Sequence, residues 1–227
     1  MSETKRVSIS APQGTPSEGR RTSTTAASRQ SLAAKRQSLN FPKAPTVIDP
    51  SAIVSTHAIL TGLHPITIGP DVVLHPYCKI SSVEGPVTIG RGCIVAERAV
   101  VGFTTETAAQ GDSALKERDV TLNRNVVVGT SAVVEAKVVD EGCLVGAGCH
   151  LKGGSNVGKY CKIAPMVIVQ PDEWIYDFMV VYGQNARRRD MTMITNKDTV
   201  FALKKEEHEQ HLAVLKRLIP SNLTKWQ

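Results

Sequence analysis

Aliphatic residues return at every sixth position along most of the chain from residue 46 onward. In a first block these recurring positions, called marks below, are Ile48, Val54, Leu60, Ile68, Leu74, Ile80, Ile89, Val95 and Val101. In a second block they are Leu122, Val128, Val134, Val139, Val145, Leu151, Val157, Ile163, Val169 and Ile175. A period of six fits neither an amphipathic helix nor the two-residue alternation of an ordinary strand. It indicates a short unit that runs straight, turns, and repeats.

The positions between the marks are regular too. The fourth residue after a mark is small or β-branched: Ala52, Ala58, Val72, Cys78, Cys93, Ala99, Val126, Ala132, Val138, Cys143, Cys149, Ser155, Cys161 and Val167. The residue directly after a mark is often glycine: Gly69, Gly90, Gly102, Gly129, Gly146 and Gly158. We interpret each unit as one side of a triangular coil, with mark and small residue inward and glycine giving backbone freedom at the corner. The pattern predicts an all-β fold, a left-handed parallel β-helix of about six coils over residues 46–182.

Departures from the period predict where loops leave the coil. Residues 63–67 and 83–88 read as small bulges, and residues 103–121 as one long polar excursion. The shorter stretch between this loop and Val139 leaves the coil count around residues 120–140 open.

After Ile175 the period fades, and residues 183–227 are expected to hold an exit segment and a C-terminal helix. This helix should begin near Asp198, end before Pro220 and lie along a flank or over an end of the prism. Its predicted apolar face consists of Phe201, Leu212, Leu215, Leu218 and Ile219.

Residues 1–44 differ from the rest in composition. They carry eight basic and two acidic residues, which leaves 19 of each sign for the remainder of a chain whose net charge is +6. Few apolar residues occur, so this segment is predicted to be a disordered basic tail. The repeated "RQSL" makes Ser31 and Ser38 candidate phosphorylation sites, and a mitochondrial presequence is an alternative reading. Because the body is neutral, the charge does not indicate a nucleic-acid-binding domain, and no apolar run is long enough for a membrane span.

The stretch "CLVGAGCHLKGGSNVGKYC" at residues 143–161 raises the question of a metal site. However, all five cysteines of the chain stand four residues after a mark: Cys78, Cys93, Cys143, Cys149 and Cys161. That position faces the coil interior, where a thiol behaves as a small apolar side chain. Since C-x-x-C pairs are missing, the cysteines are predicted to be structural and reduced, with no metal and no cofactor.

The histidines are the other residues that could carry chemistry. Six are available: His57, His64, His75, His150, His208 and His211. None has the spacing that a zinc-dependent carbonic anhydrase of this fold requires. An acyltransferase would need a histidine base beside a groove, and the excursion loop contains none. His150 falls within the repeats, where a solvated corner residue is favoured over a base. No catalytic residue is therefore predicted.

Several motifs together resemble the dynactin subunit 6 family. They are "VIDPSAIVSTHAILTG", the nine-residue side "ISSVEGPVT", "CLVGAGCHL", the exit "VVYGQNARRR" and the ending "LKRLIPSNL". The resemblance covers residues 46–223 and implies a non-enzymatic scaffold subunit of the dynactin pointed-end complex. It also implies the partners dynactin subunit 5, dynactin subunit 4 and the pointed-end actin-related protein, with dynein and cargo as indirect partners. The implied location is the cytoplasm, on the microtubule cytoskeleton.

Open sheet edges at the two ends of such a coil invite another layer of strands. The residues expected at a partner interface are Ile48, Val54, Ile163, Val169, Tyr182, Arg187, Arg188 and Arg189. The alternative is a different class of protein, a homotrimeric enzyme that resembles either gamma carbonic anhydrases or hexapeptide acyltransferases.

Overall fold

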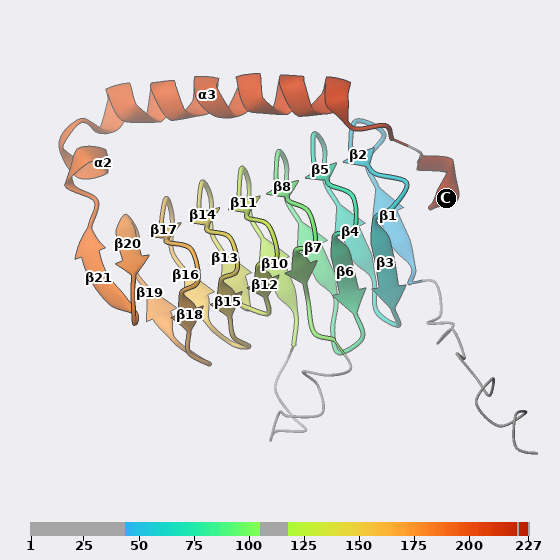
Figure 1. The fold of residues 1–227 in the computed structure, drawn as a ribbon, viewed down its shortest axis with the longest axis horizontal. Coiled ribbons are helices and arrows are strands. Elements are labelled where there is room, and N and C mark those ends of the chain that lie inside the picture. Colours follow the sequence, from blue (N-terminus) through green and yellow to red (C-terminus); the bar gives the residue numbers. More distant parts are fainter. Residues whose placement is uncertain (1–43, 105–117, 222, 227) are drawn as a thin grey trace, which may run out of the picture. The chain divides into compact units, whose positions relative to one another are not determined.

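The computed structural model describes residues 44–104, 118–221 and 223–226. Strands from successive coils stack into three parallel sheets that form the sides of a prism (Figure 1). Face 1 consists of β1 (Thr46–Ile48), β4 (Ile66–Ile68), β7 (Val87–Ile89), β10 (Val120–Leu122), β13 (Val138–Val139), β16 (Asn156–Val157) and β19 (Trp174–Ile175). Face 2 consists of β2 (Ile53–Val54), β5 (Val73–Leu74), β8 (Ile94–Val95), β11 (Val127–Val128), β14 (Leu144–Val145), β17 (Lys162–Ile163), β20 (Met179–Tyr182) and β21 (Ala186–Arg189). Face 3 consists of β3 (Ile59–Gly62), β6 (Lys79–Ser82), β9 (Val100–Val101), β12 (Val133–Val134), β15 (His150–Leu151) and β18 (Ile168–Val169).

The predicted repeat is confirmed, with six strands in the shortest face and therefore about six coils. Each strand pairs in parallel with the strand one coil away, as in the register Val128 with Val145. The shortened side does not interrupt this stacking, because β10 pairs with both β7 and β13. Among the described strands, β20 and β21 alone pair antiparallel, as a hairpin at the end of the last coil.

The prism interior is filled by the marks, and those from Val54 to Ile175 are at most 4% exposed. The five cysteines are buried beside them as free thiols, as the repeat position predicts. Register stacks Cys143 directly on Cys161, because their next residues, Leu144 and Lys162, are paired. A continuous aliphatic column of this kind needs no metal to hold it together, since each buried side chain contributes about 1.5–3 kcal/mol.

Glycines are expected after the marks because they give the backbone freedom at a corner, and this reason is wrong for most of them. Among them only Gly102 has a positive φ. A Cβ at Gly146 would lie 2.6 Å from the backbone nitrogen of Pro165, so glycine is required there because neighbouring coils approach closely. At most corners the left-handed residue stands three positions after the mark instead, as Asp71 (φ 58°) and Tyr77 (φ 61°) do.

Helix α3 (Lys197–Leu218) runs along face 2 from the last coil back to the first, after the short helix α2 (Met191–Thr195) (Figure 1). Leu212, Leu215 and Ile219 pack on Val73 and Ile94 of that face. The predicted flank position and extent are confirmed, but Leu218 is 69% exposed and does not belong to the apolar face. Among the described helices none is long and apolar enough to cross a bilayer.

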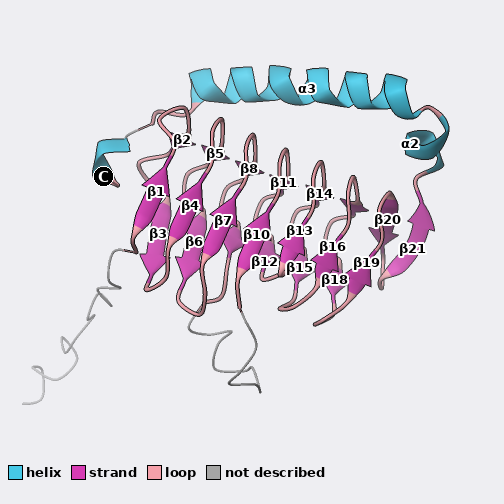
Figure 2. Cartoon of the chain, turned by 180° about the vertical axis from the view of Figure 1, so that it is seen from behind, coloured by secondary structure: helices cyan, strands magenta, loops and turns pink. Residues whose placement is uncertain are grey.

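The chain then returns to the first coil. Ser221 forms an isolated antiparallel bridge with Ser55, and the 3-10 helix η1 (Leu223–Lys225) follows. Trp226 is buried against the core, and its carbonyl accepts a hydrogen bond of 3.0 Å from Thr46. Figure 2 shows this C-terminal segment beside β1, at the opposite end of the body from β21.

Candidate functional site

The described residues contain no group of three or more His, Cys, Asp or Glu side chains placed to hold a metal ion. His57 lies beside the Tyr77 ring, with the ring centroids 5.2 Å apart. His208 contacts the carbonyl of Gly92, 2.7 Å away. Burial lowers the pKa of His75, and the neighbouring His211 lowers it further, whereas Glu97 opposes this shift. Within the described ranges, none of these four imidazoles is hydrogen-bonded to a carboxylate.

His150 differs from them because it contacts a buried carboxylate. Its Nε2 lies 3.2 Å from Oε2 of Glu135. Glu135 is only 5% exposed, whereas the imidazole of His150 is 33% exposed. The second carboxylate oxygen of Glu135 has no hydrogen-bond partner among the described residues. A carboxylate that holds a half-exposed imidazole is the arrangement that orients a histidine base.

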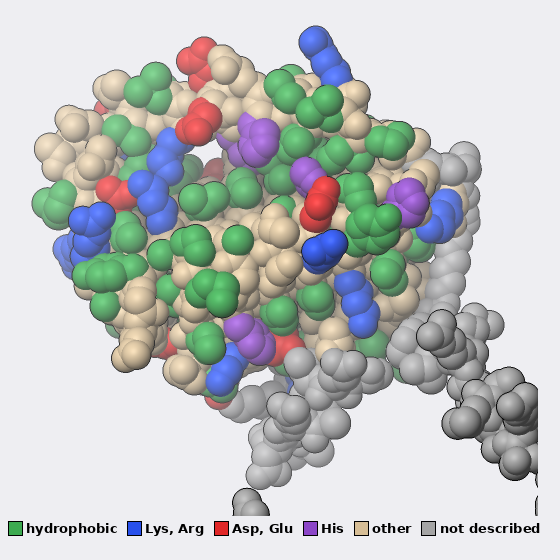
Figure 3. Space-filling model, viewed as in Figure 1, with side chains coloured by type: hydrophobic (Ala, Val, Ile, Leu, Met, Phe, Trp, Pro, Cys, Tyr) green, Lys and Arg blue, Asp and Glu red, His purple; other side chains and the backbone are tan. Residues whose placement is uncertain are grey.

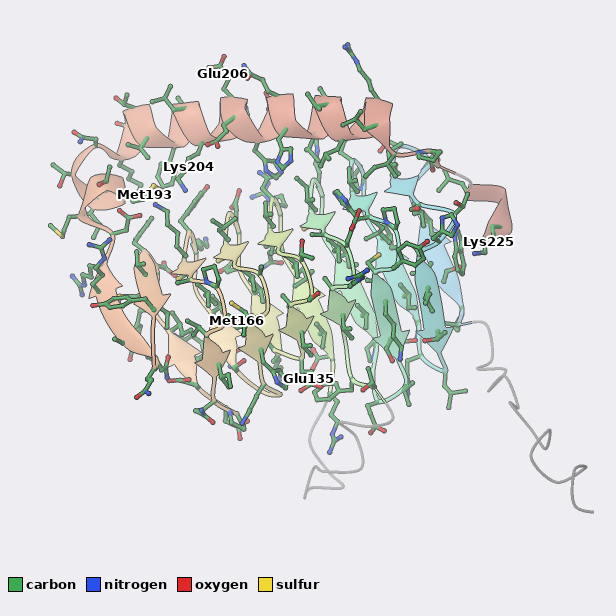
Figure 4. All side chains as sticks on the ribbon, in the orientation of Figure 1. Glu135, Met166, Met193, Lys204, Glu206 and Lys225 are labelled. Atoms are coloured by element: carbon green, nitrogen blue, oxygen red, sulfur yellow. The ribbon has the colours of Figure 1, made fainter. Side chains whose placement is uncertain are left out.

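Both side chains are positioned by the repeat. His150 is the first, outward-facing residue of β15, between Val133 on one side and Ile168 on the other. Glu135 directly follows β12, at the start of the side that is one residue short. Figure 4 labels Glu135 on the lower edge of the body, where face 3 turns into face 1. Glu135 therefore occupies the position directly after a mark, which is glycine after six of the marks.

The contact links the tautomer of the imidazole to the state of the carboxylate. When Glu135 is ionised it can only accept hydrogen bonds, and Nε2 of His150 then carries the shared proton. The lone pair of Nδ1 then remains available to take a proton from another molecule. Nearby, Phe103 packs so close to Gly153 that a Cβ there would lie 2.9 Å from the ring. Phe103, the first residue of the expected excursion, therefore lies near this pair, whereas residues 105–117 of that excursion lie outside the described residues.

The expected partner-interface residues separate into two groups. Val54, Ile163 and Val169 are buried in the prism interior, and Ile48 is half-buried against the core, so their side chains are packing residues. Tyr182 is 44% exposed, and Arg187, Arg188 and Arg189 form the exposed strand β21. Arg187 is paired with Glu173 and donates to the carbonyl of Trp174. A partner at this end stays a prediction. Ser31 and Ser38 lie outside the described residues.

The His150–Glu135 pair is not evident in the sequence alone. The five-residue interval between Val134 and Val139 is a visible signal, but by itself it raises only the question of coil number. Contact between the two residues depends on how β12 and β15 are aligned beside each other. The six-residue period gives this alignment only when the position of the corner between the two sides is known. The residue directly opposite His150 in the adjacent coil is Val133, so the contact with Glu135 is diagonal and a search for polar residues one coil apart would have missed it.

No family model matches the chain. Among solved structures, a hexapeptide transferase family protein from Anaplasma phagocytophilum is 14% identical, covers 76% of this chain and 95% of its own, and has a TM-score of 0.53. A putative acetyltransferase from Bacillus cereus is 16% identical, with 76% and 99% coverage and a TM-score of 0.41. AntD, an N-acyltransferase from Bacillus cereus solved with dTDP and 3-hydroxybutyryl-CoA, is 14% identical, with 70% and 88% coverage and a TM-score of 0.38.

The expectation of a non-enzymatic subunit of the dynactin pointed-end complex is wrong, because the Anaplasma protein that shares the fold is a hexapeptide transferase family protein. At 14% identity the similarity to the Anaplasma protein establishes the fold, so any chemistry has to be argued from this chain's own residues. The chain is a left-handed hexapeptide-repeat β-helix.

Proposed function

We propose that the protein is an acyltransferase in which His150 is the general base. The observation that carries the proposal is the 3.2 Å contact between His150 and the buried carboxylate of Glu135. The reaction class follows the name of the Anaplasma neighbour, a hexapeptide transferase family protein. The finer resemblance to the dynactin subunit 6 family rests on sequence motifs alone, and we keep it as a proposal about descent without the scaffold role.

The proposed reaction transfers an acyl group from a thioester to a hydroxyl or amine acceptor. Nδ1 of His150 accepts the acceptor's proton as its oxygen or nitrogen forms a bond to the thioester carbonyl carbon. The carbon–sulfur bond then breaks, and the imidazolium returns the proton to the leaving thiolate. Glu135 does not touch the substrate in this scheme. It is a positioning residue that holds the ring and stabilises its charged form.

The test uses the full chain with acetyl-CoA and a panel of amino- and hydroxyl-bearing acceptors that includes nucleotide-linked sugars, with mass spectrometry of the acylated product. His150→Gln should lower kcat by about a hundredfold or more, because a general base contributes about 10²–10⁴-fold. Glu135→Gln should lower kcat by about tenfold and leave KM unchanged, since it acts through ring orientation. His64→Gln is the matched control, because His64 is exposed and lies several coils away from His150, between β3 and β4.

Two results would overturn the proposal. One is acyl transfer that proceeds at the wild-type rate in the His150→Gln variant. The other is the absence of any acylated product across the panel while the folded protein is recovered from extracts in a stable complex with other proteins.

A further inference from the structure

A second hollowed region lies on a different face, beneath the part of α3 that precedes Leu212. The residues of α3 that point at face 2 change character along the helix. Near its C-terminal end Leu212 and Leu215, with the following Ile219, cover Val73 and Ile94, which are only 0–2% exposed. Before them, the residues at the corresponding spacing are Lys204, His208 and His211.

The apolar surface of face 2 continues under this polar part of the helix as far as Leu144. Val127 and Leu144 occupy the outward positions of β11 and β14. Lys162 of β17 then separates Leu144 from Val180 of β20. Leu144 is 47% exposed even though α3 passes over its strand. The helix is held at both sides of this stretch, because Phe201 packs on Tyr160 at a centroid distance of 4.4 Å and Leu212 packs on face 2. The helix therefore spans the apolar floor without covering it.

The space beneath the helix is large enough for a small molecule. One hollow of about 860 Å³ opens on the side of Arg124, Tyr160 and Lys204. A second of about 570 Å³ opens on the side of His75 and Lys162. Both are lined by Val127, Leu144 and His211, so they adjoin beneath α3. Figure 3 shows the body hollowed below the helix, with basic and histidine side chains at the opening.

The larger hollow is lined by as many acidic as basic side chains, but one of the basic ones, Lys204, is left without an ion pair among the described residues. Lys162 is paired with Asp190, with Nζ and Oδ2 2.7 Å apart. Lys204 has no hydrogen bond or ion pair within the described part of the chain, and it extends from α3 toward the strands (Figure 4). Desolvation and the nearby charge of Lys162 lower the pKa of Lys204, against the opposing effects of Asp190 and Glu207. An anion placed beside Lys204 would offset the cost of this partly buried ammonium group.

We propose that the space beneath α3 binds an amphipathic anion, with its carboxylate on Lys204 and a short aliphatic chain on Leu144 and Val127. Charge complementarity selects the carboxylate end, and the exposed aliphatic floor selects the chain. The site is separate from His150, which lies on face 3. The inference therefore stands whether or not the protein transfers acyl groups.

The experiment measures binding of three probes to the full chain by calorimetry: octanoate, 1-octanol and inorganic phosphate. Octanoate should bind with a Kd below about 1 mM, and the other two at least about tenfold more weakly, because each lacks one of the two contacts. Lys204→Met should weaken octanoate by about tenfold, through loss of a charge-assisted hydrogen bond. Arg217→Met is the control, because Arg217 is an exposed basic residue of α3 that lines neither hollow.

Two further substitutions test the aliphatic surface beneath α3. Leu144→Gln should weaken octanoate by about tenfold, whereas Ile168→Gln, an equally exposed aliphatic on face 3, should leave binding within about twofold. Octanol binding as tightly as octanoate, or equal octanoate affinity in Lys204→Met and wild type, would overturn the proposal. So would a lack of saturation up to about 10 mM octanoate.

Discussion

The cysteine thiols illustrate how a single repeat position sets a residue's chemistry. Burial raises the pKa of Cys78 and of Cys93 to about 12, from an ordinary value of about 9. Both thiols therefore remain protonated in the folded protein at pH values where the unfolded chain would ionise them. Since the thiolate is the reactive form, these two residues are expected to be inert while the coil is intact.

This shift predicts a loss of stability at alkaline pH. The folded pKa is raised, so the stabilisation is complete below about pH 9 and is lost as pH rises toward about 12. Each thiol should lower the free energy of unfolding by about 1 kcal/mol per pH unit in that window. Urea denaturation at about pH 8 and pH 10 should show a smaller loss for the Cys78→Ala/Cys93→Ala double variant than for the wild type. Equal losses in the two proteins would show that other groups control the dependence.

Also at the residue scale, the left-handed corner residues are mostly not glycine. Asp71, Tyr77 and Arg98 adopt φ values of 57–61° three positions after their marks. Each such residue costs about 1 kcal/mol of backbone strain, which the packing of two adjacent sides offsets. No single residue type marks this position in the sequence, because glycine, aspartate and asparagine share it with residues such as Tyr77 and Arg98.

At the scale of the element, α3 is held by a few leucines and not by a continuous stripe. Leu215 is 8% exposed against face 2, whereas Leu218 is 69% exposed. Leu215→Ala should cost about 2–3 kcal/mol, because it removes a buried aliphatic and leaves a cavity. Leu218→Ala should change stability by less than about 0.5 kcal/mol. Denaturation followed by circular dichroism measures both, and equal effects would contradict the packing of α3 on this face.

The strands and the helix differ in how far the amino-acid sequence predicts them. Marks such as Val128 and Val145 recur every six residues, and burial forces that register, so the coil follows from the repeat alone. The facing side of α3 does not, because Leu212, Leu215 and Leu218 are all compatible with a helix of period 3.6. Which of these leucines face the prism depends on which of them reach Val73 and Ile94. The spacing of residues within the helix does not determine this. For the same reason the polar stretch over Leu144 could not be anticipated.

At the scale of the whole body, the C-terminal residues stabilise the first coil. Trp226 is 9% exposed against that coil, and Trp174 near the opposite end is 60% exposed. Trp226→Ala should increase hydrogen exchange in β1, β2 and β3 while β14 and β17 keep their protection, because the contact is confined to the first coil. Trp174→Ala is the matched control and should leave exchange of β1–β3 unchanged. Uniform loss of protection across all coils would contradict a local cap.

The return of the chain to its first coil also affects the order in which the protein can be completed during synthesis. A solenoid with contacts only between neighbouring coils could fold one coil at a time as it leaves the ribosome. Here the carbonyl of Trp226 binds Thr46, and the hydroxyl of Ser221 accepts from the amide of Val54. The first coil made is therefore the last to be finished. Its open edge stays exposed to other nascent chains until residues 221–226 have been translated.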